Sequence, residues 1–188
     1  AFHNLAIEGV SQLKLYSFLK KPAWQTIFIF YLLQSIVSAY KFIHTMSTIL
    51  QITNADKNLT SLSKGLHAAN LEETLKGVGP FTILAPVNMA FGNLMAPDTF
   101  EELVRQASKS SKLSEILSYH IIPGKKLLKD FRNGQKVRTI NGKELNVTIK
   151  DDEVHINGAK ILSRDKQGSN GVVHSISAVN LPLEEVIV

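Results

Sequence analysis

The pattern of apolar and polar positions divides the chain into a helical first part and a strand-rich second part. Leucines recur at helical spacing in two pieces between residues 59 and 75: Leu59, Leu62 and Leu66, then Leu71 and Leu75. Between residues 145 and 156 the period changes to two, as in Leu145, Val147 and Ile149. Helices first and hairpins last, without βαβ alternation, predict an α+β fold with a largely antiparallel sheet.

The stretch from Phe81 to Phe91 stands at the centre of this pattern. Its first five residues are apolar enough for a short strand, which Pro86 stops because proline lacks the N–H that a central strand needs. Asn88 is predicted to cap a following helix. We expect six apolar residues to form one buried and mutually contacting core: Phe81, Leu84, Phe91, Leu117, Val173 and Ile176.

Local signals mark further boundaries. Asp98 with Glu101 three residues later is typical of a capping box, so a helix is predicted to begin with Asp98 as its N-cap. Asn141-Gly142 and Asn157-Gly158 are strong tight-turn pairs, and Asp151-Asp152 is a weaker one. The second half is therefore predicted to contain hairpins.

Three blocks in this chain resemble the signature blocks of the fasciclin (FAS1) family, in the family's order. The first is Phe81 to Phe91, whose usual form is Phe-Thr-Val-Phe-Ala-Pro-Thr-Asn-x-Ala-Phe. The second is Tyr119-His120. The third is Asn170 to Pro182, usually Asn-Gly-Val-Ile-His-x-Ile-Asp-x-Val-Leu-Leu-Pro.

The resemblance covers residues 47 to about 183. It implies a compact wedge of largely antiparallel strands with helices packed along one side, and a role in adhesion or matrix interaction. Leu84 stands in place of an aromatic residue and Val87 in place of a hydroxyl residue of the usual first block. The blocks occur once, which indicates one fasciclin-like domain at residues 46–188.

Composition agrees with a folded domain. The chain has 188 residues, 44% of them hydrophobic and 20% charged, with a net charge of +5. It contains no cysteine, which excludes disulfides and thiolate chemistry. The absence of disulfides suits a bacterial periplasmic or surface protein at least as well as an extracellular vertebrate module.

Residues 1–45 lie outside the fasciclin pattern. No charged residue occurs from Ala23 to Tyr40, and Lys20-Lys21 precede this apolar stretch. The pattern fits an export signal, a membrane anchor near the lower length limit for a spanning helix, or a helix packed on the domain. A further alternative is that residues 1–45 do not belong to the native protein, because Met46 is a plausible native start. We favour an export or anchor segment, which makes membrane attachment one expected property.

The search for catalytic chemistry finds no metal-binding spacing and no nucleophile motif. His120 and His174 lie in two of the matched blocks, and hydrogen-bonded structural roles are the favoured interpretation of both. The rings are expected to be buried, as is the ring of Tyr119. We therefore predict a protein that is not an enzyme and needs no metal or cofactor. Tyr119 and His120 are the candidate partner-binding residues.

One segment concentrates positive charge. Residues 123–150 hold eight lysines and arginines against two acids. Six of them are candidates for one exposed face that binds an acidic polysaccharide or lipid headgroups: Lys125, Lys126, Lys129, Arg132, Lys136 and Arg138. Stacking aromatics are missing from the segment apart from Phe131, so nucleic acid is not an expected partner. A solvated basic surface without a ligand is the competing interpretation.

The predicted function is that of a secreted, periplasmic or cell-surface domain that binds a surface or matrix protein without catalysis. The alternative is a periplasmic or surface module that binds an acidic glycan or a small apolar ligand. Two glycosylation sequons, at Asn58 and Asn146, matter only in a host that glycosylates exported proteins.

Overall fold

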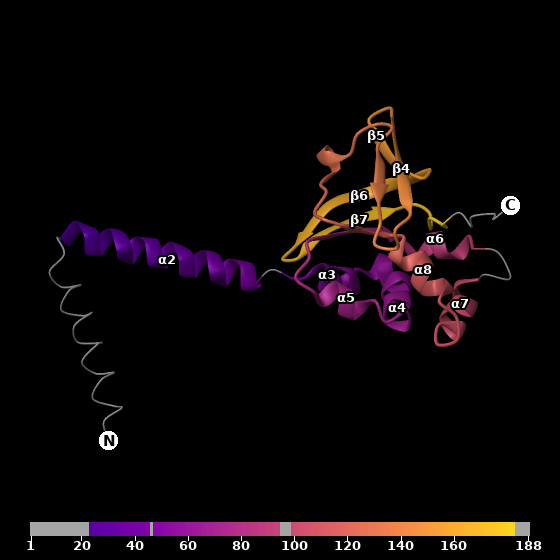
Figure 1. The fold of residues 1–188 in the computed structure, drawn as a ribbon, viewed down its shortest axis with the longest axis horizontal. Coiled ribbons are helices and arrows are strands. Elements are labelled where there is room, and N and C mark those ends of the chain that lie inside the picture. The colour runs from indigo at the N-terminus through magenta and orange to yellow at the C-terminus, as the bar shows by residue number, and fades with distance from the viewer. Residues whose placement is uncertain (1–22, 46, 95–98, 183–188) are drawn as a thin grey trace, which may run out of the picture. The chain divides into compact units, whose positions relative to one another are not determined.

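A computed structural model describes residues 23–45, 47–94 and 99–182, and Figure 1 shows the ribbon. Residues 1–45 and 46–188 form two compact units. The described part of the first unit is the helix α2 (Ala23–Thr45), whose described apolar side chains are largely exposed. No helix among the described residues combines the length and the apolar character that a membrane crossing requires. Lys20, Lys21, Met46 and Asp98 lie outside the described residues.

The second unit begins with helices and ends with strands, as the change of period predicts. Its helices are α3 (Ile49–Ala55), η1 (Lys57–Leu59), α4 (Thr60–Ala68), α5 (Glu72–Lys76), α6 (Asn88–Gly92), α7 (Phe100–Gln106), α8 (Lys112–Ser118) and η2 (Leu128–Asp130). All five leucines of the helical pattern between residues 59 and 75 are buried.

The strands are β1 (Phe81–Pro86), β2 (Ile121–Pro123), β3 (Lys136–Arg138), β4 (Glu144–Lys150), β5 (Glu153–Ile156), β6 (Ala159–Gly168) and β7 (Gly171–Ile176). They form one sheet in the order β2-β1-β7-β6-β5-β4-β3. Only the β1–β7 pair is parallel, with Ile83 opposite Val173. The α+β prediction with a largely antiparallel sheet is confirmed. In Figure 1 the helices lie along one side of β6 and β7, and β4 and β5 rise from the other side.

Two separate cores flank the sheet, which corrects the prediction of one contacting set. Phe91, Leu117 and Val173 are buried on the helical side, with Phe81 half-buried beside them. Leu84 and Ile176 are buried in the other cluster, against the hairpin strands. The physical reason is the alternation of side chains in a strand, which sends residues of opposite parity to opposite faces.

Two helix starts also differ from the sequence prediction. Val87, not Asn88, is the N-cap of α6, and Asn88 lies inside its first turn. The Asn88 side chain instead accepts a hydrogen bond from the Ser61 N–H at 2.9 Å, and so caps α4 from a distance. Helix α7 has Thr99 as its N-cap, and the Thr99 hydroxyl accepts a hydrogen bond from the Glu102 N–H. The N-cap therefore lies one residue after the predicted Asp98, and the contact between Thr99 and Glu102 supplies one half of a capping box.

The hairpin predictions are confirmed for all three turn pairs. Asp151 and Asp152 both have positive φ between β4 and β5, and Asn157-Gly158 likewise connects β5 to β6. Asn141-Gly142 lies in the connection from β3 to β4. The Ile140 N–H also donates to the Ile121 carbonyl, which joins the two ends of the sheet.

Candidate functional site

His120 follows α8 and connects it to the segment near the described C-terminal end. Its ring is 1% exposed. Nδ1 lies 2.7 Å from the Ile116 carbonyl, and Nε2 lies 2.9 Å from the Asn180 backbone nitrogen. Because a carbonyl only accepts and an N–H only donates, Nδ1 carries the proton and Nε2 accepts. Burial lowers the pKa of His120 to about 4, so the ring is neutral at physiological pH.

His174 occupies the middle of β7 and connects it to the segment that follows β2. The ring is fully buried. Nε2 donates to the Lys126 carbonyl at 2.8 Å, and Nδ1 accepts from the Asp165 backbone N–H at 3.2 Å. Burial lowers the pKa of His174 as well, against the opposing effect of the Asp165 carboxylate 4.0 Å away. Both rings therefore have both nitrogens engaged in structural hydrogen bonds.

Neither histidine has the surroundings of a catalytic base or a metal ligand. Within the described residues, no three His, Asp or Glu side chains are placed to hold a metal ion. His174 has one nearby carboxylate, but its backbone partners use both ring nitrogens. The arrangement fixes the fold and leaves no ring nitrogen to accept a proton from a substrate.

Tyr119 is also buried, with 3% of its surface exposed, and its hydroxyl joins two hairpins. The hydroxyl donates to the Glu144 carbonyl at 2.7 Å and accepts from Asn157 Nδ2 at 2.8 Å. Tyr119 lines a recess together with the exposed Leu181. A direct partner-binding role for the two side chains stays a prediction.

The recess over Tyr119 has a volume of about 480 Å³. Asn180 lies in its wall, is 4% exposed, and has an amide Nδ2 that is buried without a hydrogen-bond partner. A buried donor without a partner costs about 1–3 kcal/mol. In the usual form of the closing block this position is leucine, so the sequence did hold a signal that our sequence analysis missed.

The six candidate cations are positioned by several elements. Lys125 and Lys126 belong to the segment after β2, where the Lys126 N–H donates to the Thr82 hydroxyl at 2.9 Å. Lys125 Nζ donates to Gln167 at 2.6 Å. Two residues downstream of Lys126, the Leu128 N–H donates to Asp165 Oδ1 at 2.8 Å. The buried Thr82 and the half-exposed Asp165 therefore hold the backbone that carries these cations and Lys129 beside them.

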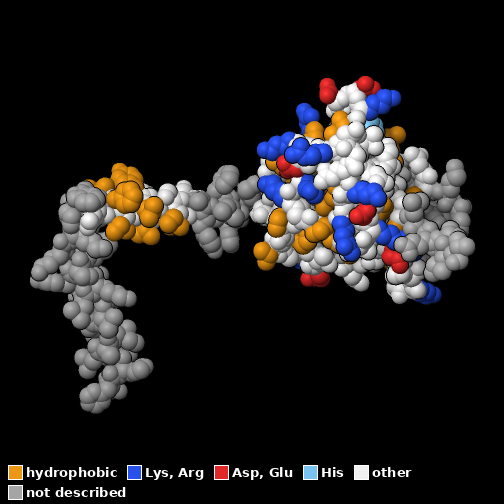
Figure 2. All heavy atoms as spheres, turned by 45° about the horizontal axis from the view of Figure 1, so that its top comes forward, with side chains coloured by type: hydrophobic (Ala, Val, Ile, Leu, Met, Phe, Trp, Pro, Cys, Tyr) orange, Lys and Arg blue, Asp and Glu red, His pale blue; other side chains and the backbone are white. Residues whose placement is uncertain are grey.

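The remaining candidates lie further along the chain. Arg132 is exposed, and Lys136 and Arg138 project from the edge strand β3, where Lys136 Nζ lies 3.7 Å from Glu144. Charged residues on an edge strand also discourage pairing with other chains, which is a structural reason for them. Figure 2 shows lysine and arginine side chains in several groups separated by uncharged surface. A single binding face stays a prediction.

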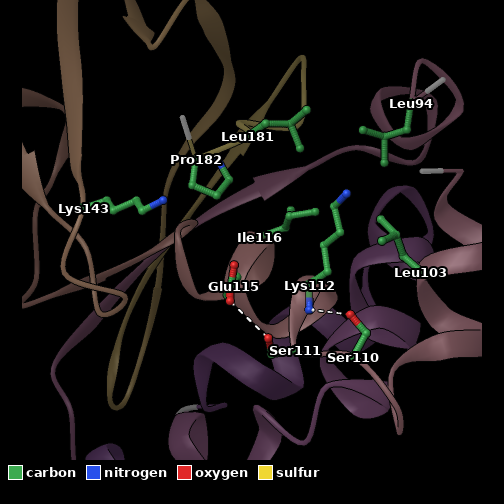
Figure 3. Close-up of a pocket in the computed structure, with 10 residues that line it drawn as sticks. All are labelled: Leu94, Leu103, Ser110, Ser111, Lys112, Glu115, Ile116, Lys143, Leu181 and Pro182. Carbon is green, nitrogen blue, oxygen red and sulfur yellow. Dashed lines mark hydrogen bonds between the residues drawn. The ribbon is translucent and has the colours of Figure 1, made fainter. Parts of the chain in front are cut away.

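A second hollow, of about 460 Å³, lies between α7, α8 and the segment at Leu181 and Pro182 (Figure 3). Leu94, Leu103 and Ile116 contribute apolar walls. The Lys112 side chain extends between these walls, and the Lys143 amine points toward Pro182 (Figure 3). The Ser111 hydroxyl donates to the Glu115 carboxylate at 3.1 Å. The groove is apolar with a charged margin.

Comparison with known proteins assigns the chain to a family. The family described as the Fasciclin domain matches residues 57–182. The chain belongs to the fasciclin family. Protein sll1483 of Synechocystis sp. is 38% identical over 135 residues, which are 72% of this chain and 73% of that protein.

Two further proteins are similar to this fasciclin domain. Cell surface glycolipoprotein MPB83 of Mycobacterium bovis is 34% identical over 113 residues, covering 60% of this chain and 48% of that protein. The solved structure of a FAS1 domain pair from the insect cell adhesion molecule Fasciclin I matches with a TM-score of 0.63 at 18% identity. It covers 72% of this chain and 51% of that chain. The last comparison confirms the fasciclin fold.

Proposed function

We propose that this fasciclin domain is a non-catalytic module for adhesion or matrix interaction that acts at a cell surface or in a secreted or periplasmic location. The observation that supports it best is the structural role of polar residues in the matched blocks. The polar side-chain atoms of His120, His174 and Tyr119 all form internal hydrogen bonds, as in residues that maintain a fold. The relation to a cell surface glycolipoprotein and the fold shared with a cell adhesion molecule agree with this role.

The partner is a surface or matrix protein, and its contact lies over Tyr119 and His120. Leu181 is 52% exposed there and stands between the recess and the groove. Its backbone neighbour Asn180 is held by His120. A large apolar side chain on a fixed backbone is a suitable anchor for a protein interface because little freedom is lost on binding.

The test is capture of surface proteins with the full chain as bait, in wild type and two variants. Leu181→Asp should lose the partner. Leu162→Asp is the matched control. Leu162 lies on β6 and is 53% exposed, so this substitution makes the same chemical change at a different surface position. A partner retained by Leu162→Asp but lost by Leu181→Asp supports the proposal. Equal capture by all three proteins would contradict it.

A second candidate function is binding of an acidic polysaccharide by the six cations. The specific observation in its favour is the anchoring of the segment after β2, because His174, Thr82 and Asp165 hold its backbone. Fixed cations lose less entropy on binding a polyanion than cations on a mobile loop. Loss of retention on an acidic column with rising salt would support this function.

We also propose that α2 attaches the chain to a lipid surface. Phe28, Phe30 and Tyr31 are exposed on this helix, and no charged residue occurs from Ala23 to Tyr40. Exposed apolar side chains favour transfer from water to lipid. Co-sedimentation of the full chain with vesicles should fall when Phe28 and Phe30 are both changed to Asp. Unchanged sedimentation would argue against attachment through α2.

A further inference from the structure

An apolar tip, formed by Val78, Pro80 and Pro123, projects from the second unit where the chain turns into β1. Val78 is 96% exposed, and both prolines are exposed as well. Pro123 lies opposite Phe81 in the antiparallel pair of β1 and β2, and the Pro80 carbonyl accepts from the Gly124 N–H at 2.8 Å. The three residues therefore belong to neighbouring segments at one end of the sheet.

Asn170, in the turn between β6 and β7, holds the backbone beneath the apolar tip. Its Nδ2 donates to the Leu75 carbonyl at 2.7 Å and to the Gly77 carbonyl at 3.1 Å. Its own carbonyl accepts from the Phe81 N–H at 3.0 Å. A Cβ on Gly79 would lie 2.4 Å from the same carbonyl oxygen, so a larger residue does not fit there without a shift of the backbone. The exposed valine is therefore carried on a loop that the core holds in place.

The same asparagine joins the apolar tip to the point at which the chain enters the second unit. Asn170 Oδ1 accepts from the Ile49 N–H at 3.0 Å, and the Ser47 carbonyl accepts from the N–H of Ser169 at 3.0 Å. In the sequence a single residue separates Ser47 from Thr45, the last residue of α2. The end of the unit that bears the tip is therefore the end at which the chain arrives from α2.

The charges beside the apolar tip balance one another. Residues 72–80 and 123–125 carry two glutamates and two lysines. Lys76 Nζ lies 2.6 Å from the Glu73 carboxylate, and Glu72 is half-buried beside them. Lys125 is exposed and donates to the neutral side chain of Gln167. A surface of this kind neither requires nor repels an anionic partner, so the apolar side chains decide what it contacts.

We propose that the apolar tip contacts the same lipid surface that α2 binds. This inference rests on the proposed attachment of α2. A single exposed valine needs no partner on an ordinary protein surface. This valine lies beside two exposed prolines, at the end where the chain arrives from a helix with exposed Phe28, Phe30 and Tyr31.

The energetics favour such a second contact. Transfer of exposed apolar side chains from water to lipid is favourable, and a loop that is already held in place loses little conformational freedom on contact. Once α2 holds the chain on the lipid, the tip meets the same surface at a high effective concentration, so a small apolar area is sufficient. The two contacts together would limit the orientations that the second unit adopts on the lipid.

The test uses the absence of cysteine from the chain, because one introduced thiol can then carry a fluorescent label at a single site. Val78→Cys and Met89→Cys, each in the full chain and labelled with an NBD group, are mixed with phosphatidylcholine vesicles. Met89 is the matched control, since it is 85% exposed and lies on α6, beyond the other end of β1. The label at position 78 should shift its emission to shorter wavelength and be quenched by nitroxide lipids. The label at position 89 should do neither.

An unlabelled variant gives an independent measurement. Val78→Asp should weaken co-sedimentation of the full chain with the vesicles by about fivefold, because it places a charge at the lipid boundary. Met89→Asp should leave co-sedimentation unchanged. Both side chains are exposed, so both variants should keep the melting temperature of the wild type.

The outcomes separate this inference from the attachment of α2. If the wild type sediments with vesicles but the label at position 78 keeps its emission in water, α2 binds lipid and the tip does not. If the wild type does not sediment, the attachment of α2 and the contact of the tip are both wrong. Equal shifts at positions 78 and 89 would overturn the proposal, because the contact would not be specific to the tip. A shift at position 78 that grows with protein concentration in the absence of vesicles would assign the tip to a contact between two copies of the chain instead.

Discussion

The regions around His120 and His174 use the same chemistry for two different connections. Each ring is neutral, donates one hydrogen bond to a carbonyl and accepts one from a backbone N–H. His120 joins α8 to the segment at Asn180. His174 joins β7 to the segment that carries Lys125 and Lys126. In both regions a neutral, buried ring holds a neighbouring segment against the core through two hydrogen bonds and without an ion pair.

The two regions differ in what surrounds the ring. Burial lowers the pKa of His120 to about 4, and its hydrogen bond to the Ile116 carbonyl opposes this effect. His174 lies 4.0 Å from the Asp165 carboxylate, which favours the protonated form and opposes the effect of burial. Asp165 is also held in the left-handed region, with φ of 57°, at an irregularity of β6. Protonation is therefore opposed more strongly at His120 than at His174.

The largest expected effect comes from truncating the two rings. His120→Ala should leave the Ile116 carbonyl and the Asn180 N–H buried without partners, and should lower the free energy of unfolding by about 4 kcal/mol. His174→Ala should cost about 2 kcal/mol, because the half-buried Lys126 segment can regain hydrogen bonds with water. Urea unfolding of both variants measures the difference. Equal losses would remove the proposed distinction between the two connections.

Protonation should separate the same two sites in the intact protein. A histidine whose pKa is lower when folded contributes stability above its unfolded pKa of about 6.5, and this stability is lost as the pH falls. For His120, with a folded pKa of about 4, the loss between pH 6.5 and 4 is roughly 3 kcal/mol.

The measurement is unfolding free energy against pH for wild type and for His120→Gln, together with the imidazole shifts in an NMR titration. The His120 ring should titrate at lower pH than the His174 ring. A His120 titration near 6.5 would contradict the burial argument, and an unchanged slope in His120→Gln would show that other groups dominate the acid range.

A smaller effect is expected from Asp165→Asn. The substituted side chain keeps an oxygen to accept from the Leu128 N–H, so the segment after β2 should stay in place. The negative charge near His174 is lost, so the pKa of His174 should fall further. Stability at neutral pH should change by less than about 1 kcal/mol. A rise in the His174 pKa in this variant would show that the carboxylate does not act on the ring.

Much of this architecture could be predicted because it depends on local patterns. Periodicity identified the helical leucines and the alternating strands, and the turn pairs located hairpins. The distribution of core residues between two faces was missed, because Leu84 and Val173 have similar sequence surroundings but opposite parity in the sheet. Asn88 was misassigned because its partner, Ser61, lies 27 residues away in sequence. Long-range pairing of polar side chains leaves little local signal.

The candidate site was less predictable than the fold for the same reason. Tyr119 and His120 were found as members of a block, but the hydrogen bond between His120 and the Asn180 backbone depends on the path of the chain at Asn180. The role of Asp165 follows from an irregularity in β6, where register shifts occur between Ile161 and Lys166. Irregularities of this kind are set by the partner strand and not by local propensity.

The smallest effect on stability is expected where the basic segment is changed. Lys129 and Arg132 are exposed, and so is Lys125, whose one side-chain contact is with the exposed Gln167. Reversing all three to Glu should change the free energy of unfolding by less than about 1 kcal/mol, because exposed charges contribute little. Retention on a heparin-like column should nevertheless be lost, since each contact with a polyanion releases counterions and makes binding steeply dependent on salt.

The matched control reverses Lys64, Lys76 and Lys109, three exposed lysines of the helical part. Equal retention of wild type and both variants at equal salt would show that the basic segment is solvated surface. Loss of retention in both variants would show that net charge alone decides binding. Loss in the first variant only would assign the polyanion to the segment that His174 holds in place.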